Sequence, residues 1–505
     1  MKRVLSVKES RRLDEIAVEN GCSIRSLIAS SGKKMAEHIL TSDYAGKSIL
    51  FVCGKGHNGA DQIAAADSLY TVYKGDIAIF VPRSVRGDLS AETARLFENT
   101  PVCITEEIGD FDVYFDGLLG TGFSDEVDGE FREIILTLNK KREQGAYVVA
   151  TDIPSGINGD SGKVCGVGVI ADETLALAAL KPGFYLNDAP DHCGKITLLD
   201  IGIGSDIYAQ VGTFARVADS AFIKSILPKR KISSYKGSSG YLHVLAGSFG
   251  MSGAAIIAAK SAYLAGAGLV KIVGEKELIS SINSGFFDAI FDVLETNDRV
   301  FSTNHNQILL SIHGYKCSLI GPGLKICQND KEAFCCLVEE LPLPLVLDAS
   351  SLTAISEYGA VETLKQRQNA TILTPHPGEM SCLMGSSIEE CERDRVLTAK
   401  TAAERFNSVV VYKGGRAVIA DPNGDIYFNP TGNGALAVAG SGDMLSGIIA
   451  GLLSGGLRPL DAALAGCYIG GKAAEAFSNV YPQMSSTASE LLRFVPSAIN
   501  SVLVP

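Results

Sequence analysis

The chain has 505 residues, 46% of them hydrophobic and 20% charged, and a formal net charge of -12. This length predicts two or three domains, each able to bury its own core. The acidic balance disfavours a nucleic-acid surface, and no apolar run reaches the ~18 residues of a membrane-spanning helix. The 12 cysteines are scattered without a C-x-x-C pair, which favours reduced thiols and a cytoplasmic location.

The first half of the chain alternates predicted helices and strands. The expected helices cover residues 8–40, 90–99 and 129–142, together with one that reaches residue 73. The expected strands cover residues 48–53, 76–82, 112–120 and 146–156. Alternation of this kind predicts parallel strands joined by right-handed crossovers, and the apolar runs suit strands that are buried on both faces.

A glycine-rich turn follows the first of these strands. Gly54, Gly56 and Gly59 fit the pattern G-x-G-x-x-G, and Asp76 stands about where a ribose-binding acid is expected. The pattern alone is weak evidence for an NAD-dependent dehydrogenase, and no catalytic set of His, Lys and Tyr accompanies it. It also does not account for the polar Asn58 inside the turn.

Three oxygen-bearing side chains, Asn58, Asp116 and Ser155, stand at the ends of predicted strands. The carboxyl ends of parallel strands meet at one edge of a sheet, where ligands bind. Ligation by oxygen alone suits hard cations rather than zinc or copper. The alternative is that Asn58 and Asp116 only cap turns.

Four stretches of this half resemble the NAD(P)H-hydrate epimerase domain over about 200 residues: CGKGHNGADQIAAADSL, VYFDGLLGTGFSDEVDGEF, VVATDIPSGINGDSG and ALKPGF. The resemblance implies that Asn58, Asp116 and Ser155 bind K⁺, and that the glycines let a hydrated nucleotide approach closely. Asp152 becomes the candidate acid/base group, because inversion at carbon C6 of the hydrate requires proton transfer. The implied contacts to that nucleotide are His57, Asn58, Gly59, Ala60, Asp61, Gly120, Thr121, Gly122, Phe123, Ser124, Asp125, Glu126 and Asp152.

The turn departs from the family pattern at three positions, and two of these departures replace a glycine. The family usually carries N-N-G-G-D-G, where this chain has H-N-G-A-D-Q, beginning at His57. Ala60 and Gln62 therefore need backbone angles that an L-residue tolerates, because positive φ is cheap only for glycine. The presumed cation ligands are intact, so the epimerase interpretation stands, while the extent of its activity is open.

The second half begins after residues 227–240, a basic stretch rich in serine and glycine that predicts a linker or an entry loop. A helix is expected over residues 252–268, and the stretch 437–456 leads into another. The segments expected to contain strands cover residues 241–248, 269–274, 317–324, 344–352, 370–379, 409–415 and 424–433. The half therefore has the same α/β architecture as the first.

The stretch A-G-S-G-D-M-L-S-G over residues 439–447 is the strongest single signal. Small residues before an acid at a helix start present backbone N–H groups and the positive end of the helix dipole to an anion. Asp443 would then stand beside the anion and could take a proton from a hydroxyl as phosphate arrives. The alternative is an N-cap aspartate on a core helix. Asp348, which follows a predicted strand, could orient a loop or touch a ligand or metal.

This half resembles the ribokinase-like superfamily and, within it, the ADP/ATP-dependent NAD(P)H-hydrate dehydratases. Five ordered motifs over about 270 residues carry the resemblance: GSFGMSGAAIIAAKSAYLAGAGLV, IGPGL, VLDASSL, TPHPGE and GSGDMLSGIIAGLL. It implies that Asp443 is the catalytic residue, and that the nucleotide is held by Lys413, Gly414, Gly415, Arg416, Ala417 and Gly442. It also implies that the hydrated nucleotide is lined by Ala254, Gly323, His376 and Asp443. Mg²⁺ is expected together with ADP or ATP.

A kinase-like fold suits this dehydration because hydroxide is a poor leaving group, with water at a pKa of about 15.7. A phosphate ester leaves more readily, since the second pKa of phosphate is about 6. Phosphoryl transfer to the C6 hydroxyl, followed by elimination of phosphate, would restore the dihydropyridine. ADP would then leave as AMP.

The sequence thus predicts two three-layer αβα domains, a Rossmann-like epimerase domain over residues 1–215 and a ribokinase-like dehydratase domain over residues 216–505. The expected substrates are the R and S hydrates of NADH and NADPH, with ADP or ATP as co-substrate. The expected assembly is a cytoplasmic homo-oligomer, a tetramer or larger, without nucleic-acid or membrane partners. Two rivals are open: a small-molecule kinase with a degenerate first domain, and a non-catalytic, nucleotide-binding regulatory protein.

Overall fold

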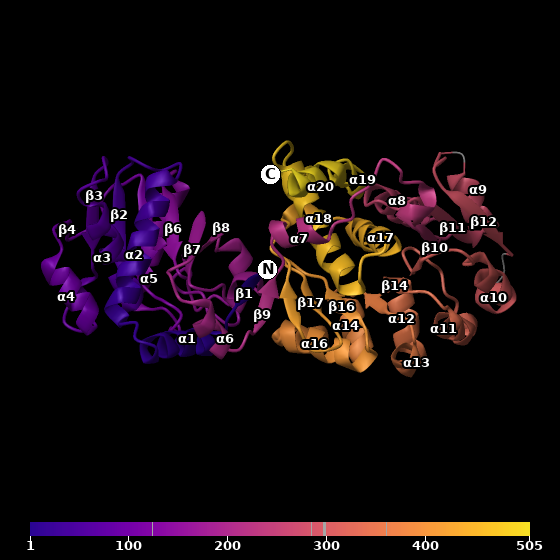
Figure 1. Cartoon of the computed structure of the whole chain (residues 1–505), viewed down its shortest axis with the longest axis horizontal. Coiled ribbons are helices and arrows are strands. Elements are labelled where there is room, and N and C mark those ends of the chain that lie inside the picture. Colours follow the sequence, from indigo (N-terminus) through magenta and orange to yellow (C-terminus); the bar gives the residue numbers. More distant parts are fainter. Residues whose placement is uncertain (124, 284, 296–298, 360, 505) are drawn as a thin grey trace. The chain divides into compact units, whose positions relative to one another are not determined.

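The computed structural model describes residues 1–123, 125–283, 285–295, 299–359 and 361–504, and only the backbone of residue 361. The chain divides into two compact units, Lys2–Arg216 and Val217–Pro505, with Met1 in the second. Each unit is a sheet with helices on both faces, which confirms the predicted three-layer αβα fold class (Figure 1). No helix among the described residues is long and apolar enough to cross a membrane.

The sheet of the unit Lys2–Arg216 is parallel, with strands in the order β4-β3-β2-β5-β6-β7-β8. Its strands are β2 (Ile49–Cys53), β3 (Ile77–Phe80), β4 (Cys103–Thr105), β5 (Val113–Gly117), β6 (Tyr147–Thr151), β7 (Glu173–Leu177) and β8 (Lys195–Leu199). The short strands β1 (Lys2–Val4) and β9 (Ala215–Val217) stand near the two ends of this segment of the chain. The strand order reverses between β2 and β5, and ligands of open α/β sheets bind at such a switch point.

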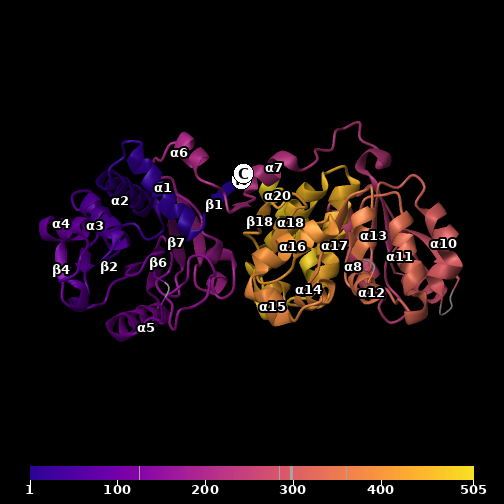
Figure 2. The ribbon, with the colours of Figure 1, turned by 90° about the horizontal axis from the view of Figure 1, so that it is seen from below.

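Side chains of this sheet alternate between two apolar layers. Phe51 of β2 packs with Met35 and Ile63 on one face, whereas Tyr114 of β5 packs with Ile135 on the other. Figure 2 shows α2 and α3 on one side of the strands and α5 on the other. The helices of this unit are α1 (Val7–Glu19), α2 (Ile24–Thr41), α3 (His57–Leu69), α4 (Ala91–Asn99), α5 (Gly129–Glu143) and α6 (Ser205–Gln210).

The helical segment predicted over residues 8–40 is in fact two helices, α1 and α2. The first begins at a capping box in which Ser6 and Glu9 bond each other's backbone N–H groups. After α1 the chain turns at Gly21, whose φ is 93°, and α2 begins after its own N-cap, Ser23. A single helix was expected because the polar turn between the two is short.

In the second unit the strands lie in the order β18-β17-β16-β15-β14-β13-β10-β11-β12. Neighbours from β10 to β16 pair in parallel, while β17 and β18 are antiparallel additions. The strands are β10 (Tyr241–Leu245), β11 (Leu269–Glu275), β12 (Ile290–Leu294), β13 (Cys317–Ile320), β14 (Leu345–Leu347), β15 (Thr371–Leu373), β16 (Val409–Tyr412), β17 (Val418–Ala420) and β18 (Ile426–Phe428). Here the strand order reverses between β10 and β13.

Helices cover both faces of this second sheet. Val244 of β10 packs with Ala258 of α8 and Ile448 of α17 in one core, and Figure 1 shows α11, α12, α14 and α16 on the opposite side of the strands. The first seven helices are α7 (Ser220–Ile226), α8 (Ser252–Leu264), α9 (Lys276–Ile282), α10 (Val300–Ser311), α11 (Lys331–Glu340), α12 (Ser350–Tyr358) and α13 (Val361–Gln366). The remainder are α14 (Pro377–Met384), α15 (Ile388–Arg393), α16 (Arg395–Phe406), α17 (Ser441–Ser454), α18 (Pro459–Ser478), α19 (Ala488–Leu492) and α20 (Val495–Leu503).

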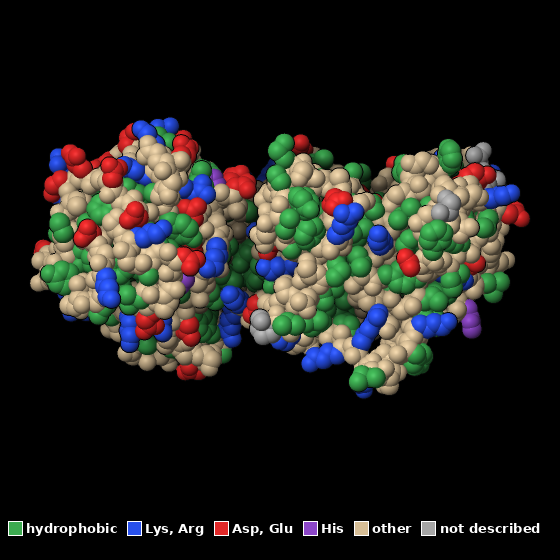
Figure 3. Space-filling view, turned by 90° about the horizontal axis from the view of Figure 1, so that it is seen from above, with side chains coloured by type: hydrophobic (Ala, Val, Ile, Leu, Met, Phe, Trp, Pro, Cys, Tyr) green, Lys and Arg blue, Asp and Glu red, His purple; other side chains and the backbone are tan. Residues whose placement is uncertain are grey.

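Every strand predicted from the sequence is present, but β1, β4, β7, β8, β9, β12 and β17 were not predicted. The stretch 227–240 is an irregular connection with one short 3-10 turn, Lys236–Ser239, as expected of a linker or entry loop. On the face drawn in Figure 3, acidic and basic side chains are interspersed over each unit.

Candidate active sites

The three oxygen-bearing side chains predicted to bind a cation meet at the switch point between β2 and β5. Asn58 donates through Nδ2 to the carbonyl of Leu119 at 3.0 Å, whereas its buried Oδ1 has no hydrogen-bond partner among the residues that the structure describes. Ser155 donates through Oγ to Asp116 at 2.6 Å and accepts from the Leu119 N–H at 2.8 Å. Burial raises the pKa of Asp116 to about 6. A buried acceptor without a donor is rare in folded proteins, and a cation would satisfy it.

The glycines of the first turn mostly serve packing within the protein. A Cβ atom on Gly54 would lie 1.9 Å from the carbonyl oxygen of Leu118, and one on Gly59 would lie 2.1 Å from that of Gly54. A Cβ atom on Gly56, the residue before α3, would meet no atom within 4 Å. Gly54 and Gly59 are therefore required by the neighbouring backbone, while the expected approach of a nucleotide to these glycines stays a prediction.

The two departures from the glycine pattern cause no backbone strain, because Ala60 and Gln62 both lie within helix α3. Ala60 is fully buried in a small apolar cluster with Ile28 and Ala64. Gln62 is fully buried and donates through Nε2 to the hydroxyl of Thr151 at 3.1 Å. The side chain of Gln62 fills space beside β5 and β6 that a glycine would leave open.

Asp152 stands just beyond β6 with a φ of 65°, a left-handed conformation that is uncommon outside glycine and is often found at functional sites. Its carboxylate pairs with the ammonium of Lys181, which is only 3% exposed. Lys181 also donates to the carbonyls of Ala179 at 3.1 Å and Leu177 at 3.3 Å. Burial and the charge of Asp152 raise the pKa of the nearby Asp61 well above its usual range.

The remaining predicted contacts of this unit lie at the same edge of the sheet. His57 begins α3. The loop of residues 120–126 follows β5, and a Cβ atom on Gly120 would lie 3.4 Å from Cβ of Asn58. Within that loop, Ser124 lies outside the described residues. The structure thus brings His57, Asp61, the loop and Asp152 together around the switch point.

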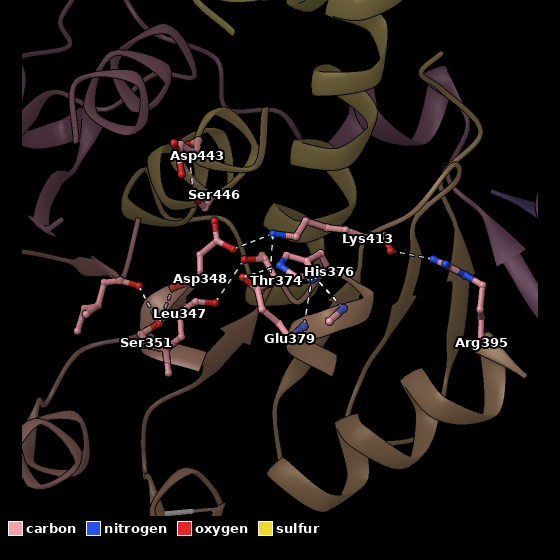
Figure 4. A network of polar contacts seen from close by, with 12 residues as sticks. Leu347, Asp348, Ser351, Thr374, His376, Glu379, Arg395, Lys413, Asp443 and Ser446 are labelled. Carbon is pink, nitrogen blue, oxygen red and sulfur yellow. Dashed lines mark hydrogen bonds and ion pairs between the residues drawn. The ribbon is translucent and has the colours of Figure 1, made fainter. Parts of the chain in front are cut away.

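In the second unit, one lysine lies among carboxylates that come from three neighbouring elements. Lys413, at the end of β16, places Nζ 2.9 Å from Asp348 and 3.7 Å from Glu379 (Figure 4). Asp348 follows β14 and is 1% exposed, while Glu379 lies in the first turn of α14. Burial alone would lower the pKa of Lys413, but the charges of Asp348, Glu379 and Asp443 raise it. Lys413 therefore remains cationic inside the site.

Asp443 lies in the first turn of α17, where the sequence placed it. Gly440 precedes the helix with a φ of 88°, and a Cβ atom on Gly442 would lie 3.4 Å from Nζ of Lys413. Burial, together with the charge of Asp348, raises the pKa of Asp443 to about 6, against the opposing charge of Lys413. Among the described residues, none donates a hydrogen bond to the Asp443 carboxylate. This carboxylate is available to a ligand, beside a helix N-terminus and a cation.

A cavity of about 750 Å³ opens beside these groups, at the carboxyl ends of the strands. His376 and Glu379 line it, and Glu379 contacts Lys413. The predicted residue Gly323 lies next to the lining: a Cβ atom there would meet Ala254 Cβ at 2.7 Å and the carbonyl of Met251, a lining residue, at 3.0 Å. The structure therefore places His376 in the lining of the cavity, with Gly323 and Ala254 just behind the lining residue Met251.

His376 has a defined orientation. Its Nδ1 accepts from the backbone N–H groups of Gly378 at 3.0 Å and Glu379 at 3.3 Å. The hydrogen of the neutral ring is therefore on Nε2, which lies 3.4 Å from Glu379. His376 thus caps α14 and keeps a donor at the edge of the cavity.

The predicted nucleotide loop, residues 413–417, rests on a buried arginine. Arg395 donates to the carbonyls of Lys413 at 3.0 Å and Tyr412 at 3.3 Å, and its guanidinium lies 4.4 Å from the centre of the Tyr412 ring. A Cβ atom on Gly414 would lie 2.3 Å from this guanidinium. Arg395 therefore fixes the backbone on which Lys413 stands, and a larger residue at position 414 would displace its guanidinium.

Comparisons with known proteins show the family of the chain. A family model described as NAD(P)H-hydrate dehydratase matches residues 242–497, and one described as YjeF-related protein N-terminus matches residues 25–183. The bifunctional NAD(P)H-hydrate repair enzyme Nnr of Coxiella burnetii is 33% identical over 498 residues, which cover 98% of each chain. The chain belongs to the bifunctional NAD(P)H-hydrate repair enzymes.

A further relative is similar over most of the chain, and two solved structures are similar over somewhat more than half of it. The enzyme of the same name from Moorella thermoacetica is 31% identical, covering 94% of this chain and 92% of the relative. Among solved structures, a ribokinase-like superfamily protein of Enterococcus faecalis covers 58% of this chain and 97% of its own, with 20% identity and a TM-score of 0.50. The ADP/ATP-dependent NAD(P)H-hydrate dehydratase of Bacillus subtilis, co-crystallised with ATP/Mg²⁺, is 30% identical, covers 58% of this chain and 100% of its own, and has a TM-score of 0.49.

Sequence reasoning missed several residues of the two sites. Lys181 and Glu379 lie inside motifs that were recognised, ALKPGF and TPHPGE, but neither was assigned a role. Asp14 of α1 faces the charges of Asp152 and Lys181. The spacing of Ser6 and Glu9 is a capping-box signature that could have placed the start of α1, and hence Asp14, more accurately. No sequence pattern would have indicated Arg395.

Proposed function

We propose that this chain repairs hydrated nicotinamide nucleotides through two sites. The unit Lys2–Arg216 would interconvert (R)- and (S)-NAD(P)HX, and the unit Val217–Pro505 would dehydrate the S form with ADP or ATP. Membership of the bifunctional repair enzymes supports both activities. The single observation that carries the proposal is the Asp443 carboxylate, which receives no hydrogen bond from any described residue and is set at a helix N-terminus beside Lys413 and a neighbouring cavity.

The arrangement around Asp443 suits phosphoryl transfer to a hydroxyl. The N-terminal N–H groups of α17 and the ammonium of Lys413 would bind the phosphate chain of the nucleotide. Asp443 would take the proton of the C6 hydroxyl as the terminal phosphoryl group arrives. The phosphate ester then leaves C6 as inorganic phosphate, and loss of a ring proton restores the dihydropyridine. From ADP the products are AMP, phosphate and NAD(P)H.

Mg²⁺ would accompany the nucleotide in this site. The described residues contain no cluster of three or more His, Cys, Asp and Glu side chains that could hold a metal by themselves. Mg²⁺ is usually held by one or two carboxylates together with substrate phosphates, and Asp348, Glu379 and Asp443 supply oxygen ligands nearby. When bound, the ion would neutralise negative charge on the transferring phosphate.

In the first unit, the proposed cation is K⁺. The unpartnered Oδ1 of Asn58, the buried carboxylate of Asp116 and the hydroxyl of Ser155 provide the hard oxygen ligands that such an ion prefers. When bound, K⁺ would fix the loop after β5 beside the substrate. Asp152, paired with Lys181, would carry out the proton transfer at C6.

One incubation tests both activities. Chemically hydrated NADH is mixed with the protein, ADP and Mg²⁺, and the R and S isomers are separated by chromatography while absorbance at 340 nm is recorded. We expect loss of both isomers, recovery of NADH and release of phosphate. A stable phosphorylated product would instead indicate a small-molecule kinase, and unchanged hydrates without nucleotide consumption would indicate a non-catalytic binding protein. A cytoplasmic location and a homo-oligomer of four or more chains stay predictions.

A further inference from the structure

Helix α1 borders the proposed epimerase site. The chain before the helix is tied to the residue next to Lys181, because the Leu5 N–H donates to the carbonyl of Leu180 at 2.9 Å. The first N–H of the helix, at Val7, donates to Asp160 at 2.7 Å, in the segment that follows Asp152. Two independent hydrogen bonds therefore position α1 against the segments that carry Asp152 and Lys181.

The same helix reaches the loop predicted to hold the substrate. A Cβ atom on Gly122 would lie 3.4 Å from Nη2 of Arg11. Arg11 and Asp14 are three residues apart and so share one face of α1, while Leu13, Ile16 and Ala17 pack into the protein. The face with Arg11 and Asp14 is thus a wall of the proposed site.

Asp14 joins the charged groups of that site. Its carboxyl faces the charges of Asp152, Lys181 and His57, and also that of Glu15 on its own helix. The negative charge of Asp14 in turn raises the pKa of Asp61 and the pKa of Tyr208. Loss of hydration among these groups, with the negative charge of Asp152, raises the pKa of Asp14 to about 6. Because the side chain remains open to solvent, its proton can exchange with bulk water.

Inversion of a carbinol carbon beside a ring nitrogen needs two proton transfers. The C–O bond at C6 breaks when the hydroxyl receives a proton and departs as water, while the lone pair on N1 forms the N1=C6 double bond of an iminium ion. A water molecule then adds to the other face of C6, and its surplus proton must be removed. A single carboxyl group on one side of the ring cannot perform both transfers in one passage.

We propose that Asp14 is the second acid/base residue of the epimerase reaction and works opposite Asp152. This inference rests on the epimerase function proposed above. In one direction, neutral Asp14 protonates the departing hydroxyl, and the Asp152 carboxylate takes the proton of the incoming water. In the other direction the two carboxyl groups exchange roles. One proton leaves the first carboxyl and another reaches the second, so the pair returns to its starting state when Asp152 releases its proton and Asp14 takes one from solvent.

The test replaces Asp14 in the full-length protein. In Asp14→Asn, we expect the enzymatic exchange of (R)- and (S)-NADHX to fall by at least ~10²-fold, the lower end of what general acid–base catalysis contributes. ADP-dependent dehydration of purified S hydrate should stay at the wild-type rate. Asp14→Glu should recover part of the exchange, because it keeps a carboxyl group. The matched control is Glu15→Gln, which removes the neighbouring charge from a side chain that bonds Arg12 instead, and should exchange like the wild type.

The pH profile separates catalysis from a structural role. Exchange requires one carboxyl group neutral and the other ionised. The wild-type kcat/KM for exchange should therefore fall as pH rises through about 6. The residual activity of Asp14→Asn should not show this fall. The melting temperature should be unchanged. Wild-type exchange in Asp14→Asn overturns the role of Asp14, as does a loss accompanied by unfolding of both Asn and Glu variants. Failure of the wild type itself to exceed the uncatalysed exchange would overturn the epimerase function instead.

Discussion

Both sites place one lysine among three carboxyl groups, yet the two lysines face different surroundings. Lys181 is 3% exposed, and its ammonium is occupied by Asp152 and two backbone carbonyls. Lys413 is 19% exposed and lies against Gly442, at the start of α17. The first lysine is enclosed by protein acceptors, whereas the second stands beside a helix terminus that attracts anions.

This difference separates two kinds of chemistry. Around Lys181 the carboxyl groups of Asp14 and Asp61 have raised pKa values despite the charge of the lysine, so protons can be held and passed within the site. Around Lys413 the ammonium and the helix N-terminus offer positive potential to a phosphate chain, and one carboxylate, Asp443, has no donor within the described part of the chain. The same residue types therefore suit proton exchange in one unit and phosphoryl transfer in the other.

The largest expected effect is that of Asp443→Asn. We expect ADP-dependent recovery of 340-nm absorbance from the S hydrate to fall by ~10²–10⁴-fold, because the amide cannot accept the hydroxyl proton. Exchange between R and S isomers should be unaffected. In the wild type, kcat/KM for dehydration should decline as pH falls through about 6, since the base must be ionised. Recovery at the wild-type rate in the variant would refute the role of Asp443.

Asp152→Asn should have the opposite effect on the two activities: isomer exchange is lost and dehydration is kept. Exchange of the isomers should drop by at least ~10²-fold, while the S hydrate is still dehydrated with ADP. Chromatography of both isomers over time measures the two activities in one reaction. In a mixture of hydrates, this variant should consume the S form and leave the R form behind. Normal isomer exchange would remove Asp152 from the mechanism.

A smaller effect is expected at the cation ligands. Asn58→Ala removes the unpartnered Oδ1, and we expect the K⁺ concentration for half-maximal exchange to rise by about tenfold or more, in line with the 10–100-fold cost of disturbing metal surroundings. Dehydration by the same protein serves as the internal control. Equal K⁺ dependence in variant and wild type, or no dependence in either, would contradict the proposed site.

The residues at strand ends could be predicted because the fold places them. Asn58, Asp116 and Asp348 each end or follow an apolar run, and parallel strands bring such positions to one edge of a sheet. The position of Lys181 was harder to predict, because it follows the strand β7. The sequence of β7, E-T-L-A-L, is rich in helix-forming residues, and it forms a strand only because it is buried in the sheet. The position of Asp14 beside the site depends on how α1 packs, and this could not be predicted while residues 8–40 were expected to form one long helix.

The smallest expected effect concerns a residue that no pattern indicated. Arg395→Lys keeps the positive charge but loses the planar fork that bonds the carbonyls of Tyr412 and Lys413 and stacks on the Tyr412 ring. A lysine ammonium can keep one of the two bonds, and the other is worth about 0.5–1.5 kcal/mol, so we expect KM for ADP to rise by roughly two- to tenfold with kcat nearly unchanged. Arg393→Lys, on the exposed end of α15, is the matched control. If Arg395 only stabilised the fold, the melting temperature would fall while KM for ADP stayed constant. A selective rise in KM would show that the loop must be held rigid for Lys413 to meet the phosphates, a requirement that the enclosed Lys181 does not share.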